Sequence, residues 1–257
     1  MKYFIVDAFT DERFKGNPAG VCLLDEWLDD DTMQAIAFEN NLSETAFVVK
    51  RENHYDLRWF TPDVEIDLCG HATLASAFVV SNFVDQNEAL MRFETKSGTL
   101  TVTKIGDLYE LDFPARKPEP IELTSEMSRA IGLSVLEAHL SRDLLLFVEN
   151  EQQVQALNPS FDLLEQLPYF AVIVTAEGDE VDFVSRFFAP GASIPEDPVT
   201  GSAHCSLIPF WAERLGKEKM VARQLSKRGG TLFCENRGSR VKIAGKAVLY
   251  LQGEILI

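Results

Sequence analysis

Two halves of this chain repeat the same short segments in the same order, and this duplication constrains the fold more than any other feature. Each half carries an aromatic segment ending in proline, then a glycine that opens an apolar helical run, then a strand pair around a glycine turn. The matching pairs are RWFTP at 58–62 with RFFAP at 186–190, CGHA at 69–72 with TGSA at 200–203, and TKSGTLTV at 95–102 with SKRGGTLFC at 226–234. Three matches in one order favour a duplicated α+β unit.

Local patterns supply the elements of each half. Apolar residues at helical spacing predict four helices, over 29–41, 71–83, 124–132 and 201–216, the last capped by Gly216. Alternating apolar residues between glycine turns predict strands elsewhere. The proline-rich stretch at 114–120 is the natural link, so we expect an N-terminal lobe over 1–116 and a C-terminal lobe over 117–257.

The duplication also suggests where a ligand would bind. Two homologous lobes related by a pseudo-twofold axis are expected to form a cleft, and clefts between domains are favoured ligand sites. The loops at 67–72 and 196–204 each feed the start of a predicted helix, where unpaired N–H groups and the helix dipole bind anions. Gly70 and Gly201 could equally serve as tight turns, but their recurrence at matched positions favours a carboxylate site.

Composition narrows the class of protein. A net charge of −16 argues against nucleic-acid partners and anionic membrane surfaces, both of which need clustered Lys and Arg. The first residues form an alternating strand without the features of a signal peptide, and the four cysteines include no C-x-x-C pair, so we expect a cytoplasmic protein with reduced thiols. Metal-ligand spacings, G-x-G-x-x-G and P-loop motifs are absent, so neither a metal nor a cofactor is expected.

Four segments together resemble the PhzF family of phenazine-biosynthesis-like isomerases: IVDAFTDERFKGNPAGV at 5–21, NLSETAFV at 41–48, RWFTPDVEIDLCGHATLA at 58–75 and IPEDPVTGSAHC at 194–205. The resemblance covers essentially the whole chain. It implies the α+β diaminopimelate epimerase fold, in which each of two lobes wraps a mostly antiparallel sheet around a central helix. It also implies a homodimer and cofactor-independent proton transfer on a small anionic metabolite. The best-understood member moves a proton within a dihydro-hydroxyanthranilate ring.

The resemblance implies a site made of Glu44 as general acid/base, with Gly70, His71, Asp197, Gly201 and Ser202 around the substrate. Glu44 lies at a helix-to-strand junction, where a partly desolvated carboxylate would suit proton transfer, although most glutamates are simply solvated. His71 follows a helix start, whose dipole would disfavour the imidazolium form, and it could instead cap or pack.

The remaining candidates also have structural alternatives. Asp197 lies between two prolines and could orient the substrate amino group or His71, or only shape its loop. Ser202 could cap its helix, bind a carboxylate, or do both. Asn17, held extended before a proline, is a weaker binding candidate, and His204 is expected to pack rather than react.

Cys69 raises a competing mechanism. The related diaminopimelate epimerases use two cysteines, each just before the glycine of a helix-start loop, and these positions correspond here to Cys69 and Thr200. A threonine hydroxyl is far too weak an acid for two-thiol epimerisation, and residues two apart do not normally face each other on a helix, so His71 is not expected to activate Cys69. A Cys69-dependent amino-acid epimerase or racemase and a non-catalytic binding protein remain as alternatives.

Overall fold

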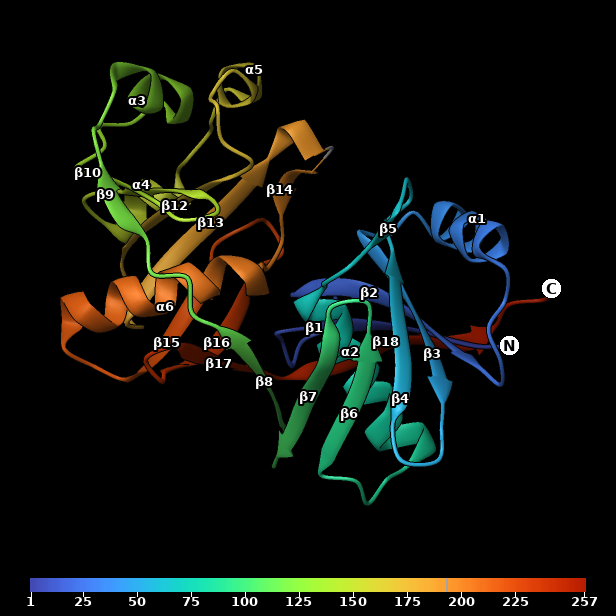
Figure 1. Ribbon diagram of the computed structural model, residues 1–257. Coiled ribbons are helices and arrows are strands. Elements are labelled where there is room, and N and C mark those ends of the chain that lie inside the picture. The colour runs from blue at the N-terminus through green and yellow to red at the C-terminus, as the bar shows by residue number, and fades with distance from the viewer. Residues whose placement is uncertain (193) are drawn as a thin grey trace. The chain divides into compact units, whose positions relative to one another are not determined.

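The computed structural model describes residues 1–192 and 194–257, and they form two compact units (Figure 1). Unit 1 contains Met1–Asp112 together with Ala244–Ile257, and unit 2 contains Phe113–Ile243. Each unit is an α+β structure with one helix largely enclosed by strands. Within the described residues, every helix is too short or too polar to cross a membrane.

Unit 1 is built on strands that run from the C-terminal β18 through β1, β2, β3, β4 and β6 to β7 and β8. The pairings are antiparallel except for β2–β3 and β4–β6, and the short β5 adds to β4. The bounds are β1 (Lys2–Ala8), β2 (Asn17–Leu24), α1 (Asp30–Asn40), β3 (Glu44–Lys50), β4 (Tyr55–Phe60), β5 (Glu65–Ile66), α2 (Gly70–Val79), the π-helical turn η1 (Val80–Val84), β6 (Leu90–Thr95), β7 (Gly98–Ile105), β8 (Leu108–Pro114) and β18 (Ala247–Glu254).

Unit 2 repeats this pattern of pairing. Strands β11–β12 and β13–β15 are parallel, β9–β10, β10–β11, β12–β13 and β15–β16 are antiparallel, and the short β14 adds to β13. The bounds are β9 (Glu119–Ile121), α3 (Ser125–Ile131), β10 (Glu137–Leu140), β11 (Leu144–Phe147), α4 (Glu151–Gln155), α5 (Phe161–Glu165), β12 (Val172–Glu177), β13 (Phe183–Ala189), the 3-10 turn η2 (Pro190–Ala192), β14 (Ile194–Asp197), α6 (Gly201–Leu215), β15 (Lys219–Gln224), β16 (Gly230–Asn236) and β17 (Arg240–Gly245).

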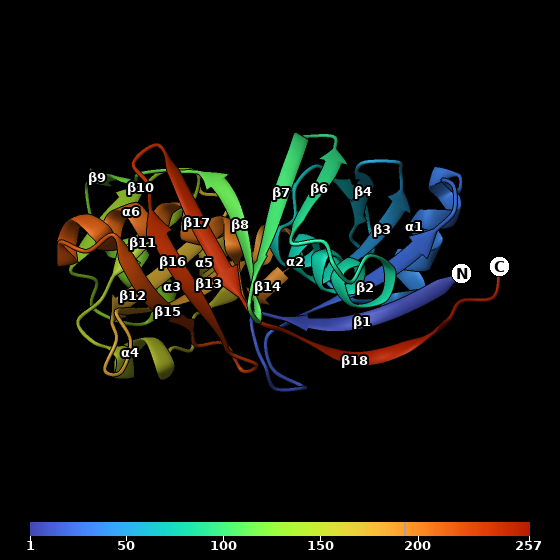
Figure 2. The same cartoon turned by 90° about the horizontal axis from the view of Figure 1, so that it is seen from below.

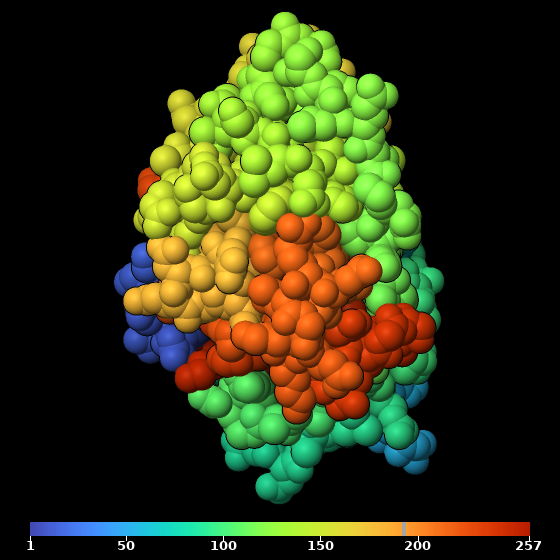
Figure 3. All heavy atoms as spheres, turned by 90° about the vertical axis from the view of Figure 1, so that its left-hand side faces the viewer, coloured from blue at the N-terminus to red at the C-terminus, as the bar shows by residue number. Residues whose placement is uncertain are grey.

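The central helices α2 and α6 occupy the same place in this repeated order, between the short added strand and the following parallel strand. Helix α2 is apolar on nearly every side and packs against β1, β2 and β3, as a helix enclosed by strands must. Helix α6 is buried from Ala203 to Ala212 and reaches the surface at its C-terminal end, seen in orange in Figure 3. It ends at Gly216, whose φ of 64° gives the left-handed cap that glycine adopts without strain.

One boundary expectation is wrong. The sequence assigned all of 117–257 to the C-terminal lobe, but the last strand belongs to unit 1 and the change between units falls at Asp112/Phe113. Strand β18 pairs along the whole length of β1, from Lys2 opposite Glu254 to Ala8 opposite Ala247 (Figure 2). A pairing between the two ends of a chain leaves no local pattern in the sequence, so the linear repeat could not reveal it.

The duplication extends to a side-chain arrangement that holds β4 to β5 and β13 to β14. Arg58 makes two hydrogen bonds of 2.7 Å to Glu65, and Arg186 bonds to Glu196 at 2.6 and 2.9 Å. Each guanidinium also lies about 5 Å from a phenylalanine ring two residues later, Phe60 and Phe188. Because β5 and β14 each lead into the start of a central helix, these two ion pairs stabilise the two helix-start loops. The pairs Arg58–Glu65 and Arg186–Glu196 are termed the arginine braces.

Candidate active site

Four polar side chains of unit 1 come together at the start of α2. Glu44 is the first residue of β3, Asn17 the first of β2, and Cys69 and His71 flank the glycine that opens α2. All four are buried, and the Glu44 and His71 side chains are only 10% and 7% exposed. Strand pairing brings β2 and β3 side by side in parallel, so their first residues lie at the same edge of the sheet, next to α2.

The closest contact in this group joins Glu44 and His71. Glu44 Oε2 lies 3.0 Å from His71 Nε2, yet the two atoms are poorly aligned for a hydrogen bond, and neither has a well-aligned partner elsewhere in the described residues. Buried polar atoms are normally satisfied, so this unfilled capacity marks the place where a ligand or a moving proton would be accommodated. The burial expected for Glu44 is therefore observed, with a specific partner.

The other ring nitrogen of His71 also has neighbours. Nδ1 lies 3.5 Å from Cys69 Sγ and 3.3 Å from Asn17 Nδ2. The expectation that Cys69 and His71 would not face each other is wrong. Cys69 is the N-cap residue, in extended conformation with φ −143° and ψ 114°, so the helical spacing rule does not apply to it.

The charges of this group depend on one another. Burial lowers the pKa of His71 most strongly, but Cys69 and the Glu44 carboxylate both raise it, and the net pKa lies well above the usual histidine value. The helix dipole predicted a neutral imidazole, and the direction of this pKa shift runs against that prediction. Burial, and then Glu44, raise the pKa of the Cys69 thiol, so the sulfur is protonated at neutral pH.

Glu44, Cys69 and His71 also form a candidate metal group, since their ligand atoms lie within 4.8 Å of one another. Their arrangement does not favour a metal ion. The Cys69 sulfur lies next to Nδ1 of His71, and the Glu44 carboxylate lies next to Nε2. The lone pairs of these two nitrogens point in different directions, so a single ion bound to one nitrogen would lie beside only one of the two partners. The expectation of no metal remains a prediction.

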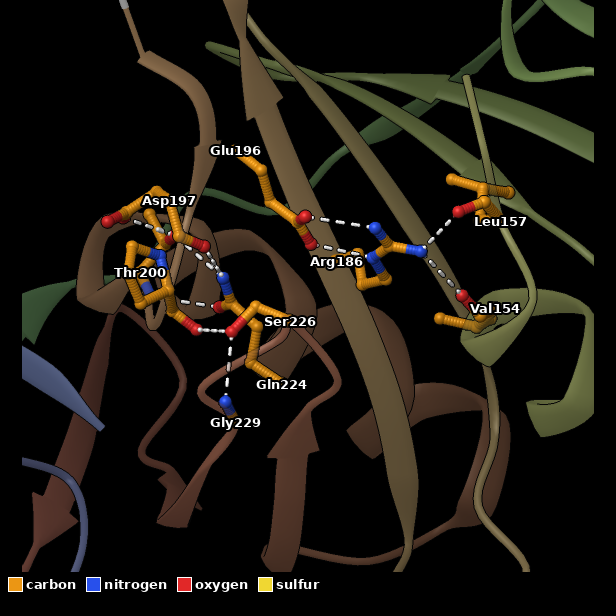
Figure 4. Close-up of polar contacts among 10 residues, drawn as sticks. Val154, Leu157, Arg186, Glu196, Asp197, Thr200, Gln224, Ser226 and Gly229 are labelled. Carbon is orange, nitrogen blue, oxygen red and sulfur yellow. Dashed lines mark hydrogen bonds and ion pairs between the residues drawn. The ribbon is translucent and has the colours of Figure 1, made fainter. Parts of the chain in front are cut away.

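The second predicted loop belongs to unit 2, and its residues are linked by hydrogen bonds (Figure 4). Asp197 Oδ2 accepts a bond of 2.5 Å from the Thr200 hydroxyl. The Gln224 amide accepts from Thr200 N at 2.8 Å and donates to Asp197 O and Thr200 Oγ1 at 2.7 and 3.1 Å. Ser226 Oγ donates to Pro198 O and accepts from Gly229 N. Asp197 therefore helps to set the conformation of its loop, which was the structural alternative to a role in substrate binding.

The sequence did not identify Gln224 as part of this loop. Gln224 is buried at the end of β15, far from Thr200 in the chain, and only the fold brings the two together. Of the two roles left open for Ser202, capping of α6 is not observed, because the N-cap is Thr200 and Ser202 lies inside the first turn; carboxylate binding stays a prediction. His204 packs as expected: it is fully buried, and its Nδ1 lies 2.8 Å from the Thr200 carbonyl.

Both central helices begin without a side-chain cap. Within the described residues, neither Cys69 nor Thr200 makes a side-chain hydrogen bond to its helix start. Ser, Thr, Asp and Asn usually satisfy these N–H groups, and Thr200 instead directs its hydroxyl to Asp197. The first turns that begin at Gly70 and Gly201 therefore receive no cap from the preceding side chain, and helix starts of this kind can bind anions.

Comparison with known proteins identifies the family of this chain. Residues 6–253 match the family PhzC-PhzF, described as phenazine biosynthesis-like protein. The chain belongs to the PhzC-PhzF family. An uncharacterized isomerase of Pseudomonas aeruginosa is 52% identical over 252 residues, covering 98% of this chain and 97% of that protein. The predictions of this family and of an isomerase are thereby confirmed.

Solved structures place the PhzC-PhzF chain in a wider fold group. A PhzF-family protein of Enterococcus faecalis is 51% identical, with a TM-score of 0.98 over 100% of this chain and 99% of that one. A hydroxyproline epimerase of Agrobacterium vitis has a TM-score of 0.64 over 98% and 91% of the two chains at 10% identity, a likeness of fold alone. The predicted epimerase-like α+β fold is confirmed.

Proposed function

We propose that this protein is a cofactor-independent isomerase that moves a proton on a small, carboxylate-bearing metabolite, with a cyclic amino acid-like compound as the expected type. Glu44 is the general acid/base. The observation that carries this proposal is the buried Glu44–His71 contact of 3.0 Å, in which neither facing atom has a well-aligned hydrogen bond. An acid/base pair held out of water can take a proton from carbon and return it without another reagent.

The surrounding groups have supporting roles in this proposal. His71 lies 3.0 Å from Glu44, and its raised pKa makes it a proton-holding partner of that carboxyl group. The uncapped start of α2 at Gly70 binds the substrate carboxylate through its amides, so a strongly acidic protein can still hold an anion. Asn17 orients His71 through its amide group.

The second loop would bind substrate in the same manner. Asp197, Gly201 and Ser202 surround an uncapped helix start, and Gln224 holds that loop in place. Asp197 would interact with a substrate amino group while keeping its bond to Thr200. That this loop and the first act on one substrate remains a prediction.

The proposal is tested with Glu44→Gln, which keeps the shape of the side chain and removes its acid/base chemistry. The wild-type protein should incorporate deuterium from D2O into at least one member of a panel of amino and cyclic carboxylates, followed by proton NMR. Glu44→Gln should reduce the rate by at least about 100-fold, the usual contribution of a general acid/base. Glu39→Gln, at an exposed position of α1, is the matched control and should exchange at the wild-type rate.

The outcomes separate this proposal from the alternatives. Full exchange in Glu44→Gln would refute the assigned acid/base, and no exchange by the wild type into any compound would favour a non-catalytic binding protein. A Cys69-dependent epimerase needs a reactive thiol, whereas burial raises the pKa of Cys69 and Thr200 stands in place of the second cysteine. Exchange that survives in Cys69→Ala would end that alternative.

A further inference from the structure

His71 has a partner at each ring nitrogen, and the two partners at Nδ1 differ in what they can do. The Asn17 amide nitrogen, 3.3 Å away, can only donate a hydrogen bond. The Cys69 sulfur, 3.5 Å away, can donate through its S–H or accept through a lone pair. Of these two neighbours, the sulfur is therefore the one able to accept a bond from a protonated Nδ1.

This difference matters because the imidazole is buried. In neutral His71 with its hydrogen on Nε2, directed toward Glu44, Nδ1 accepts from Asn17 or from the thiol. When Nδ1 takes up a proton from solvent, that N–H needs an acceptor, since an unsatisfied buried donor is costly. The thiol hydrogen then turns away and the sulfur lone pair accepts; no bond to sulfur forms or breaks.

We propose that Cys69 is a positioning residue whose thiol serves Nδ1 in both charge states of His71 and thereby stabilises the imidazolium that faces Glu44. The inference rests on the proposed acid/base role of Glu44 and assigns Cys69 no contact with substrate. The titratable groups against His71 are Cys69, at the N-cap of α2, and Glu44, at the start of β3; Asn17 of β2 adds a neutral amide.

The inference also explains how a cysteine can occupy this position without reacting. Its thiol is buried, and burial raises its pKa, so it does not become a nucleophile at neutral pH. A weak, reversible hydrogen-bonding group is what a histidine that changes charge requires. The sulfur thus has a hydrogen-bonding role at His71 and does not need a second thiol to account for its presence.

The test is the protonation of His71, followed by nitrogen-15 NMR of the imidazole in protein labelled at its four histidines. The His71 signals are assigned by their loss in His71→Asn. Cys69→Ala should lower the titration midpoint of His71 by about one pH unit, because a hydrogen bond to a charged group is worth more than one to a neutral group. Cys69→Ser, whose hydroxyl also donates and accepts, should titrate close to wild type.

The outcomes are decisive without a known substrate. An unchanged midpoint in Cys69→Ala would overturn the inference, as would an equal fall in Cys69→Ser, which would indicate a general packing effect. Cys69→Val, similar in size and without a polar atom, replaces the alanine variant if the latter does not fold. Because the titration needs no turnover, failure here is distinguishable from failure of the proposed function, which the Glu44→Gln exchange assay reports.

Discussion

His71 and His204 are both buried at the first turn of a central helix, yet their surroundings shift the pKa in opposite directions. His71 lies beside the Glu44 carboxylate, and its pKa is raised. His204 lies near Phe183 and the Thr200 carbonyl, and burial lowers its pKa to about 4. The neighbouring groups, and not burial alone, therefore set the direction in which each pKa moves.

His204 should make the protein sensitive to acid. Its pKa is near 6.5 when unfolded and about 4 when folded, so the unfolded chain binds more protons between these values. Stability is fully present above about pH 6.5 and is lost as pH falls toward 4. The loss attributable to this residue is about 3 kcal/mol by the linkage of pKa to free energy. Urea unfolding at pH 7.5 and at pH 4.5 measures it.

A substitution separates His204 from other acid effects. His204→Asn keeps a donor near the Thr200 carbonyl and removes the titration, so its free energy of unfolding should fall less between the two pH values. His54→Asn, at a half-exposed position, should keep the wild-type loss. Equal losses in His204→Asn and wild type would show that this histidine does not govern acid stability.

At the level of elements, the two arginine braces are the clearest product of the duplication. Arg58 and Arg186 each hold a carboxylate on the neighbouring short strand and lie beside a phenylalanine. Arg186 also donates to the carbonyls of Leu157 and Val154, which ties the end of α4 to β13. The internal repeat aligned Arg58 with Arg186 but did not align Glu65 with Glu196, because the loop before the second central helix is longer than the loop before the first.

Removing one acidic partner should destabilise the unit that contains it. Glu196→Ala leaves the half-buried Arg186 without its paired acceptor and should lower the free energy of unfolding by about 2 kcal/mol, and Glu65→Ala should act similarly through Arg58. Glu180→Ala, which breaks an exposed pair with Arg223, is the control and should change little. The measurement is urea unfolding; equal stability of all three variants would contradict the role of the braces.

Helices were the elements that the sequence predicted best. The expected helices correspond to α1, α2, α3 and α6, and Gly132 and Gly216 end α3 and α6 in the left-handed conformation. The short helices α4 and α5, of five residues each, were not predicted. Segments this short carry too few turns for an apolar period to be recognised, and tertiary packing stabilises them.

At the level of the whole molecule, the chain closes unit 1 with its own last strand. Beyond the β1–β18 pairing, the amino group of Met1 donates to the Ile255 carbonyl, and Ile255 N donates to Met1 O. Strand β1 also carries the fully buried Phe4 and Val6. Loss of β18 would leave one side of β1 without partners, a state that favours local unfolding and association through the free edge.

Deleting residues 247–257 should therefore destabilise unit 1 selectively. Amide hydrogen exchange should rise along β1 and β2 while the core of unit 2 around β12 and β13 stays protected, because those strands pair within unit 2. Deleting only the exposed Leu256 and Ile257 is the matched control and should leave exchange unchanged. Unchanged protection of β1 in the longer deletion would contradict this account.

The duplicated α+β architecture and the main helices could be predicted from the sequence, because periodicity, capping glycines and recurring motifs are local properties. The resemblance to a known family, and not periodicity, pointed to Glu44, Gly70 and His71 as site candidates. Only the tertiary structure decided that Cys69 faces His71, that Gln224 holds the second loop and that β18 belongs with β1. It also decided the direction in which the pKa of His71 moves, since a pKa depends on which groups share a buried space and not on which residues are adjacent in the chain.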